Sequence, residues 1–171
     1  MGDGTGAPSF EELALPLLAA LYNYALWLTK NQAESEDLVQ ETYVKGMRGF
    51  GSFAEGTNFR AWMYRILRNT FLTSRSGLRA APHLSIEDDR ELVEELSGDS
   101  APDRSIIARV DASALRRVID DLPLPFREVL LLSDVEEMSY REIAEALSIP
   151  VGTVTSRLMR ARRKVREAVQ R

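Results

Sequence analysis

The sequence predicts an all-α protein of two small helical modules joined by a flexible acidic linker, with the C-terminal module a helix-turn-helix. Apolar residues recur at helical spacing along most of the 171 residues, and no segment alternates convincingly as a strand would. Ser9 and Ser139 each open a capping box, with a glutamate three residues further on, which is typical of a helix N-terminus. From 77 to 104 the helical pattern lapses among prolines and acidic residues. These observations predict modules at 1–76 and 105–171 on either side of a linker at 77–104.

Three helices are expected in the first module. The first follows the capping box at Ser9, and Pro16 is tolerated there in the first turns or at a kink. The second opens at Asn31 and the third near Asn58, and the glycines between them, at 49–56, indicate a loop. The apolar positions expected to face the core are Leu13, Leu17, Leu21, Tyr24 and Leu28, then Leu38, Val39, Tyr43, Met47 and Phe50, then Phe59, Trp62, Met63, Ile66, Leu67 and Thr70.

The last two helices of the second module have the layout of a helix-turn-helix. The expected helices lie near Ser105–Asp121, Pro125–Ser133, Ser139–Leu147 and Thr153–Gln170. The connection at 148–152 is short and contains a proline and a glycine. Ile143, Leu147, Val154 and Leu158 can fill the angle between the two helices.

Composition excludes several classes of protein. A hydrophobic share of 44% excludes wholesale disorder, and the sequence holds no uncharged apolar run of about 18 residues, so we expect no membrane span. The first ten residues lack the basic and apolar parts of a secretory signal, which predicts a cytoplasmic protein. With no cysteine and one histidine, His83, we expect no disulfide, metal site, cofactor or catalytic residue. An enzyme is therefore disfavoured.

The net charge of −4 conceals an uneven distribution of charge. Residues 1–76 carry −1, residues 77–111 carry −5 and residues 112–171 carry +2. Asn58–Ser76 contains four arginines and no acidic residue, and Thr153–Arg171 contains seven basic residues against one glutamate. Two basic stretches separated by an acidic one suggest two surfaces that face the phosphates of one polymer. The alternative is two solvated helix faces without a ligand.

The second helix of the helix-turn-helix carries the side chains that would read DNA. Its outward positions near the N-terminal half are Thr153, Thr155, Ser156, Met159 and Arg160, where a recognition helix contacts base edges in the major groove. The residues expected closer to phosphates are Arg157, Arg162, Arg163, Lys164 and Arg166. An ordinary helical hairpin with a basic surface is the alternative, but the capping box, the short turn and the arginine cluster together favour DNA binding.

The segment 53–71 mixes aromatic residues with arginines and amides, as single-strand binding requires. Arg60, Arg65 and Arg68 have no acidic residue nearby and can track a phosphate backbone, while exposed rings and amides can hold unstacked bases. The alternative is that the rings are core. We expect Trp62 and Ile66 to be core residues, and the candidates for exposure are Phe53, Tyr64 and Asn69.

Three runs in order, 33–42, 58–69 and 122–163, resemble the extracytoplasmic-function (ECF, group 4) sigma factors of bacterial RNA polymerase, in the sigma-70 family. The resemblance covers nearly the whole chain. The loop at 55–58 and the continuation at 69–71 resemble the branch of thiol-oxidative stress, which often has a zinc-binding anti-sigma partner. At Thr155 the family often has an arginine, and at Met159 an aromatic residue, so these two positions depart from its pattern.

The resemblance assigns 1–76 to sigma region 2, 105–171 to region 4 and 77–104 to a linker. It implies that region 2 binds the clamp coiled coil of the largest polymerase subunit through Asp37, Gln40 and Glu41, and that the polymerase flap region is a further contact. It implies −10 element contacts at Phe53, Asn58, Arg60, Tyr64, Arg65, Arg68 and Asn69, with a flipped base held near Phe53, Tyr64 and Asn69. The implied −35 contacts are Thr153, Thr155, Ser156, Arg157, Met159, Arg160 and Arg163.

The favoured function is therefore a sigma factor that binds core polymerase, recognises −35 and −10 promoter elements and helps to open the duplex for a regulon that is expected to be stress-responsive. An anti-sigma factor is an expected partner. The first alternative is a self-contained helix-turn-helix regulator, which has no evident use for the runs at 37–41 and 62–69. The second is a helical anti-sigma or adaptor protein, which has no role for the basic C-terminal helix.

Overall fold

The computed structural model describes residues 6–54, 56–76 and 112–170, and the regular structure within these ranges is entirely helical. Contacts divide the chain into two compact units, Met1–Ala80 and Ala81–Arg171. The predicted all-α class with two helical modules is confirmed. The predicted acidic linker at 77–104 lies outside the described residues. None of the helices in the described ranges is long and apolar enough to cross a membrane.

The first unit begins with a capped helix that is followed by a 3-10 turn. Helix α1 (Phe10–Ala14) starts after Ser9, whose hydroxyl accepts the N–H of Glu12 at 3.2 Å while the Glu12 carboxylate accepts the N–H of Ser9 at 2.8 Å. Pro16 lies in the 3-10 turn η1 (Leu15–Leu17), and α2 (Leu18–Thr29) continues from there. The capping box is as predicted, and Pro16 is accommodated in the 3-10 turn, because proline has no N–H to donate within a helix.

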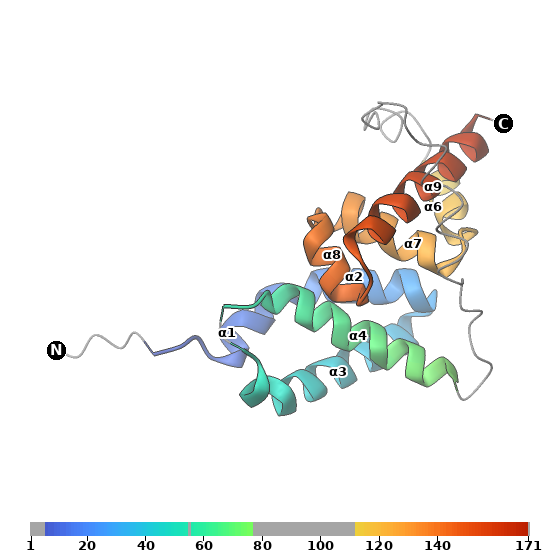
Figure 1. Ribbon diagram of the computed structural model, residues 1–171. Coiled ribbons are helices and arrows are strands. Elements are labelled where there is room, and N and C mark those ends of the chain that lie inside the picture. Colours follow the sequence, from blue (N-terminus) through green and yellow to red (C-terminus); the bar gives the residue numbers. More distant parts are fainter. Residues whose placement is uncertain (1–5, 55, 77–111, 171) are drawn as a thin grey trace. The chain divides into compact units, whose positions relative to one another are not determined.

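Helices α3 (Gln32–Gly49) and α4 (Phe59–Ser76) complete the first unit, with the 3-10 turn η2 (Phe50–Ser52) between them. The side-chain oxygen of Asn31 accepts the N–H of Glu34 at 3.0 Å and caps α3. Helix α3 packs against both α2 and α4 (Figure 1). The largest fully buried side chains of this unit are Leu21, Tyr24, Met63, Tyr64 and Leu67.

One residue of the expected core lies on the surface instead. Met47 is 58% exposed, although it continues the apolar line predicted for α3. The buried side of α3 follows a different phase of the helix, through Leu38, Val39, Thr42 and Gly46. Gly46 allows close packing, since a Cβ there would lie 3.0 Å from the sulfur of Met63.

The second unit contains α6 (Ala112–Asp120), α7 (Leu124–Leu130), α8 (Tyr140–Leu147) and α9 (Val151–Val169) among its described residues. The π-helical turn η4 (Leu131–Val135) extends α7. Residues 105–111 of the helix predicted near 105–121 lie outside the description. Ser139 and Glu142 form the predicted capping box of α8. Helix α9 begins two residues earlier than predicted, with Pro150 as its N-cap.

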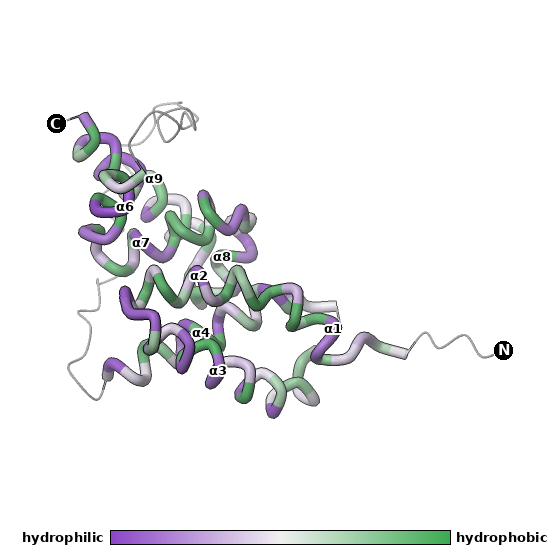
Figure 2. Tube along the Cα trace, turned by 180° about the vertical axis from the view of Figure 1, so that it is seen from behind, coloured by the Kyte–Doolittle hydropathy of each residue, from purple (hydrophilic) through white to green (hydrophobic). Residues whose placement is uncertain are grey.

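The angle of the helix-turn-helix is filled as the sequence predicts. Ile143, Leu147, Val154 and Leu158 are all buried. Helix α8 ends at Ser148 in the left-handed conformation (φ 55°), and the N–H of Ile149 donates to the carbonyl of Ala144 at 3.1 Å. In Figure 2 hydrophobic residues recur along each helix, as the periodicity requires.

The turn between α6 and α7 is held by one arginine. The guanidinium of Arg127 donates to the carbonyls of Asp120 at 2.7 Å and Leu122 at 2.9 Å, so a cation lies at the C-terminal end of α6. Burial lowers the pKa of Arg127, although the acidic groups of Asp120, Glu128 and Asp121 act in the opposite direction. This arginine is consequently a structural residue of the second unit.

Candidate nucleic-acid interface

The loop between α3 and α4 is shaped by local hydrogen bonds. The N–H of Phe53 donates to the carbonyl of Phe50 at 3.0 Å, and the hydroxyl of Thr57 donates to the carbonyl of Ala54 at 2.7 Å. Gly56 adopts a left-handed φ of 84°, which few residues with a side chain adopt. The side-chain oxygen of Asn58 accepts the N–H of Ala61 at 2.9 Å, so this candidate contact caps the first turn of α4.

Phe53 joins the loop to the helices through its ring. It lies parallel to Phe50 at a centroid distance of 6.1 Å and meets the Phe59 ring edge-on at 5.3 Å. Its centroid is 5.1 Å from that of Trp62. Phe53 is half-buried. Trp62 and Ile66 are also half-buried rather than fully in the core, because they lie at the edge of the bundle. The sequence pattern does not reveal this edge position.

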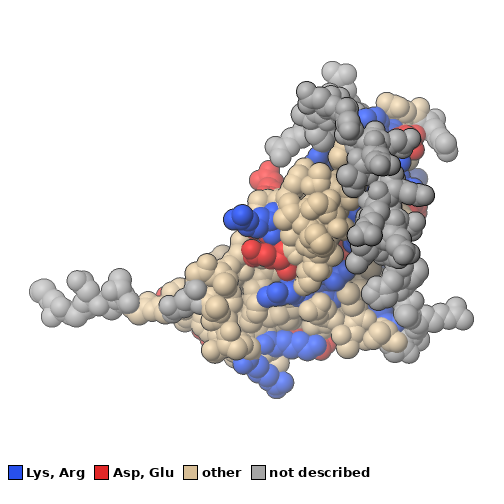
Figure 3. Space-filling model, in the orientation of Figure 1, with Lys and Arg blue, Asp and Glu red and all other residues tan. Residues whose placement is uncertain are grey.

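Helix α4 presents a mixed aromatic and basic face. Trp62, Arg65, Ile66 and Asn69 follow one another at three- and four-residue spacing and share a side of the helix. Arg65 and Asn69 are exposed, and Arg68 is half-buried. Figure 3 shows blue Lys and Arg side chains on the surface of this unit. A polyanion could therefore contact the arginines while a base reaches the rings and the amide.

Tyr64 does not belong to the exposed surface, and the expectation that it does is wrong. Its side chain is 1% exposed, and its ring packs 5.3 Å from that of Tyr24. The guanidinium of Arg60 lies over the Tyr64 ring, 5.8 Å from the centroid. Met63, Tyr64 and Leu67 together form the buried side of α4, so a base could reach Tyr64 only if the core opened.

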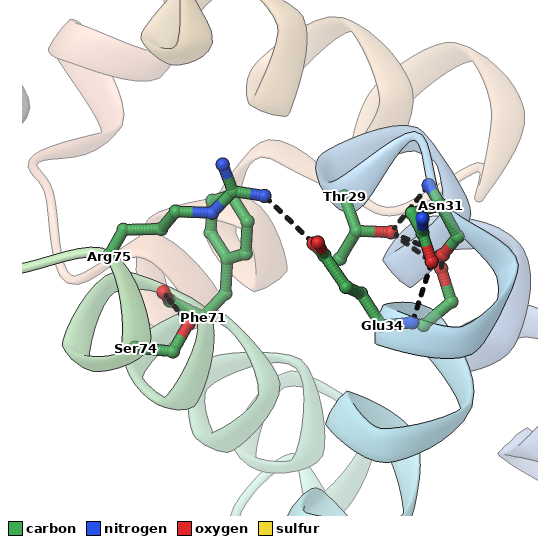
Figure 4. Close-up of polar contacts among 7 residues, drawn as sticks. Thr29, Asn31, Glu34, Phe71, Ser74 and Arg75 are labelled. Atoms are coloured by element: carbon green, nitrogen blue, oxygen red, sulfur yellow. Dashed lines mark hydrogen bonds and ion pairs between the residues drawn. The ribbon is translucent and has the colours of Figure 1, made fainter. Parts of the chain in front are cut away.

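The far end of α4 is tied to the start of α3 (Figure 4). Arg75 reaches the carboxylate of Glu34 at 3.1 Å, and its guanidinium lies 5.2 Å from the centroid of Phe71. The backbone N–H of Glu34 also donates to Asn31, next to the hydroxyl of Thr29. One of the four arginines of the basic stretch is therefore already paired with an acidic residue.

The three candidate polymerase contacts lie together on α3. Asp37, Gln40 and Glu41 are all exposed, and their spacing places them on one side of the helix. Lys45 pairs with Glu41 at 2.7 Å and also approaches the Thr70 hydroxyl at 3.2 Å. About half of each side chain of the ion pair is exposed, so a partner could displace it at little energetic cost.

Helix α9 presents most of the candidate −35 contacts at least partly to solvent. Thr153, Thr155, Ser156, Met159 and Arg160 are half-buried and Arg163 is exposed. The hydroxyl of Thr155 donates to the carbonyl of Val151 at 3.1 Å, and that of Ser156 to the carbonyl of Thr153 at 3.2 Å. Both hydroxyls therefore bond back to their own helix.

Arg157 lies on the buried side of α9, contrary to the expectation of a phosphate contact. It is 8% exposed and follows Val154 on the inner side, with Leu158 and Ala161 next along it. Arg157, Leu158 and Ala161 follow Val154 by three, four and seven positions, which places them on one side of a helix. The helical period of the sequence could therefore have identified Arg157 as a buried residue.

Arg162 is also withdrawn from the surface predicted for it. Its guanidinium makes two hydrogen bonds to the carboxylate of Asp134 and a longer one, at 3.4 Å, to the hydroxyl of Ser133. Lys164 lies 6.0 Å from the centroid of the Phe126 ring. Arg163, Lys164 and Arg166 remain exposed on α9. The basic surface of this helix is thus smaller than its sequence suggests.

The two units define the class of the protein as a helical protein of two modules, with exposed basic side chains on α4 and on α9. Within the described ranges no group of three or more His, Cys, Asp or Glu side chains could hold a metal ion. Residues 13–80 match the family described as sigma-70 region 2, and residues 112–165 match sigma-70, region 4.

Known proteins resemble the chain along nearly its whole length. The ECF RNA polymerase sigma factor SigE of Mycolicibacterium smegmatis is 34% identical over 168 residues, covering 97% of this chain and 63% of the relative. The RNA polymerase sigma-H factor of Pseudomonas aeruginosa is 30% identical over 168 residues (95% and 86%), and EcfG of Rhodopseudomonas palustris is 32% identical over 157 (92% and 83%). The chain belongs to the ECF family of RNA polymerase sigma factors.

Solved structures resemble it as well. The sigma factor RpoE from Bartonella quintana, in complex with the anti-sigma factor NepR, matches with a TM-score of 0.71 and 26% identity, over 94% of this chain and 96% of that one. CnrH in complex with the cytosolic domain of CnrY matches with a TM-score of 0.66 and 25% identity, over 94% and 87%.

Proposed function

We propose that this ECF sigma factor binds core RNA polymerase, recognises −35 and −10 promoter elements and assists strand opening in the cytoplasm, without catalysing a reaction itself. The observation that carries the proposal is the order of two family regions on two compact units, each with an exposed basic side chain on its candidate DNA helix. We assign 1–76 to region 2, 77–104 to the linker and 105–171 to region 4.

Region 2 acts on the −10 element through the loop and α4. Phe53 and Trp62 offer half-buried rings beside the exposed amide of Asn69, and Arg65 lies on the same side of the helix. Rings and amides suit an unstacked base, because a ring stacks on any base and an amide bonds to its edge. Arg60, which lies over the buried ring of Tyr64, and the half-buried Arg68 are further proposed −10 contacts, while Asn58 contributes by fixing the start of α4.

Region 4 acts on the −35 element through α9. The N-terminal half of this helix carries Thr153, Ser156 and Arg160, which suit base edges, and Arg163 suits a phosphate. Thr155 and Met159 stand where the family often has an arginine and an aromatic residue. The preferred −35 sequence is therefore expected to differ from the one that those residues read.

The polymerase contact is Asp37, Gln40 and Glu41 on α3, which we assign to the clamp coiled coil of the largest subunit. The flap region of the polymerase is a further proposed contact. An anti-sigma factor is a further proposed partner, and the sigma factor RpoE in complex with the anti-sigma factor NepR supports it by resemblance. The thiol-oxidative-stress branch and the stress-responsive regulon stay predictions.

Transcription with purified core polymerase on a randomised promoter pool tests the function. We expect initiation only when core and this protein are both present, and selection of paired −35 and −10 elements. Tight footprinting of duplex DNA by the isolated protein without core-dependent initiation would favour the self-contained regulator instead.

A matched pair of variants on α4 sharpens the test. Arg65→Ala removes an exposed cation, whereas Arg75→Ala removes one that Glu34 already neutralises. We expect open-complex formation to fall several-fold more for Arg65→Ala than for Arg75→Ala. Equal effects of the two would contradict the assignment of this side of α4 to DNA.

A further inference from the structure

The short helix α1 contributes the buried centre of an aromatic cluster. We define the aromatic cluster as the rings of Phe10, Tyr43, Phe50, Phe53, Phe59 and Trp62. Phe10 is 6% exposed, and the other five rings are half-buried. Figure 1 shows α1 at the end of the unit where α3 finishes and α4 begins. The first helix therefore lies against the segment that carries the candidate −10 loop.

Phe10 touches both ends of that loop. Its ring meets the rings of Phe50 and Phe59 edge-on, with centroids 5.6 and 6.0 Å away. Tyr43 meets it edge-on from α3 at 6.2 Å. Helix α3 also approaches closely at Gly46, where a Cβ would lie 3.1 Å from the Phe10 ring. There is little room for the Phe10 ring to move without displacing these neighbours.

The aromatic cluster is what joins the loop to the helices. The hydrogen bonds at Ser52 and Thr57 each reach three residues back, so they shape the loop without attaching it to the bundle. Phe53, in contrast, packs on Phe50, Phe59 and Trp62, and two of these three rings rest on Phe10. A shift of Phe10 would therefore be passed on to Phe53.

The capping box determines where Phe10 lies. Phe10 is the first residue of α1, directly after Ser9, and both hydrogen bonds of the box close around that first turn. Such a box fixes the start of a helix. A five-residue helix has little stability of its own, so its position depends on this cap and on the packing of Phe10.

We infer that α1 is a positioning element for the loop that reads the −10 element, with Phe10 as the positioning residue. The inference rests on the proposed function, because it gives the N-terminal helix a role in promoter reading. Phe10 acts through Phe50 and Phe59 on Phe53 and Trp62, and it does not touch DNA. A purely structural role would instead affect the stability of the unit without changing the loop selectively.

A fluorescence measurement on the free, full-length protein tests the positioning directly. In a Trp27→Phe background Trp62 is the sole tryptophan. We expect Phe10→Leu to raise acrylamide quenching of Trp62 about twofold, because a half-buried ring that loses its packing becomes accessible. Leu28→Ala in α2 is the control for lost core volume, since Leu28 is also buried but lies outside the aromatic cluster. Unchanged quenching in Phe10→Leu, or an equal rise in both variants, would overturn the inference.

The second measurement uses the reconstituted holoenzyme. We expect Phe10→Leu to reduce discrimination among −10 bases about tenfold, as weakened ring packing loosens the loop. Recognition of the −35 element should not change. Ser9→Ala keeps every ring and should shift selectivity in the same direction by less. Retained selectivity in Phe10→Leu would contradict the inference. If the wild-type protein gives no core-dependent initiation, that result contradicts the proposed function. The quenching measurement on the free protein then decides whether Phe10 positions the loop.

Discussion

Arg162 of α9 and Asp134 of the π-helical turn form a two-pronged ion pair whose side chains are only 17% and 15% exposed. The pair joins the end of the α7 segment to the recognition helix. Burial by itself would lower the pKa of Arg162, but the hydrogen bonds and negative charge of Asp134, together with Tyr140, outweigh it and raise that pKa. This side chain, which the sequence assigns to phosphates, is therefore part of the packing that sets the direction of α9.

The first prediction concerns this ion pair. Asp134→Ala leaves the Arg162 cation poorly solvated and should lower the free energy of unfolding of the second unit by about 2 kcal/mol. Urea denaturation followed by circular dichroism measures the loss. The double variant Asp134→Leu/Arg162→Met should recover part of it, because neither charge is then left without a partner. A double variant less stable than either single one would show that the pair contributes more than burial of similar apolar volume.

The second prediction separates two arginines of α9. Arg160→Ala should weaken binding to the −35 element by about 1–3 kcal/mol and leave the thermal midpoint nearly unchanged. Arg157→Ala should mainly lower the thermal midpoint, because Arg157 is buried. Fluorescence anisotropy with −35 duplexes and the holoenzyme measures the binding, and thermal melting of each variant measures the midpoint. Arg163→Ala serves as the phosphate control and should reduce the salt dependence of binding by about one unit of slope.

The third prediction concerns Tyr64 and Asn69. Tyr64→Ala removes a fully buried ring and should cost about 3–5 kcal/mol of stability, so closed and open complexes should decrease together. Asn69→Ala alters an exposed residue and should impair opening more than closed-complex formation. Permanganate reactivity of unpaired thymines measures opening, and filter binding measures the closed complex. A selective opening defect in Tyr64→Ala with unchanged stability would restore this residue to the base pocket.

The fourth prediction is a pH dependence in the first unit. The Tyr43 hydroxyl donates to the carbonyl of Ala14, and burial raises the pKa of Tyr43 above its ordinary value of about 10. The folded state therefore holds the phenolic proton more tightly than the unfolded chain. This contribution to stability is complete below pH about 10 and is lost as the pH rises through the folded pKa.

Comparison with Tyr43→Phe isolates that contribution from those of other groups. The variant should be less stable by about 1 kcal/mol at neutral pH, where the hydrogen bond is missing, and the difference from the wild type should shrink above pH about 10. Urea denaturation at a series of alkaline pH values measures it. If the difference in stability between the wild type and Tyr43→Phe stays constant with pH, the folded and unfolded states hold the phenolic proton of Tyr43 equally tightly.

Local rules account for most of the elements. The boxes at Ser9 and Ser139 and the cap at Asn31 depend on residues within one turn, so the sequence reveals them, and the apolar period identifies the helix-turn-helix core. Helix ends were less predictable: Pro150, which the sequence places in the connection, is the N-cap of α9. The same limit applies to Met47, whose apolar character does not reveal which phase of α3 faces inward.

By itself, then, the sequence determined the helical class, the helix starts with side-chain caps, the uneven charge and the family resemblance, because each depends on neighbouring residues or on short motifs in order. The tertiary structure alone decided which charged and aromatic side chains are available to a ligand. Tyr64 turned inward, Arg162 joined Asp134 across 28 residues, and Phe10 joined rings far along the chain. The physical reason is that burial and pairing depend on which helix faces meet, and helical periodicity within one segment does not specify its partner.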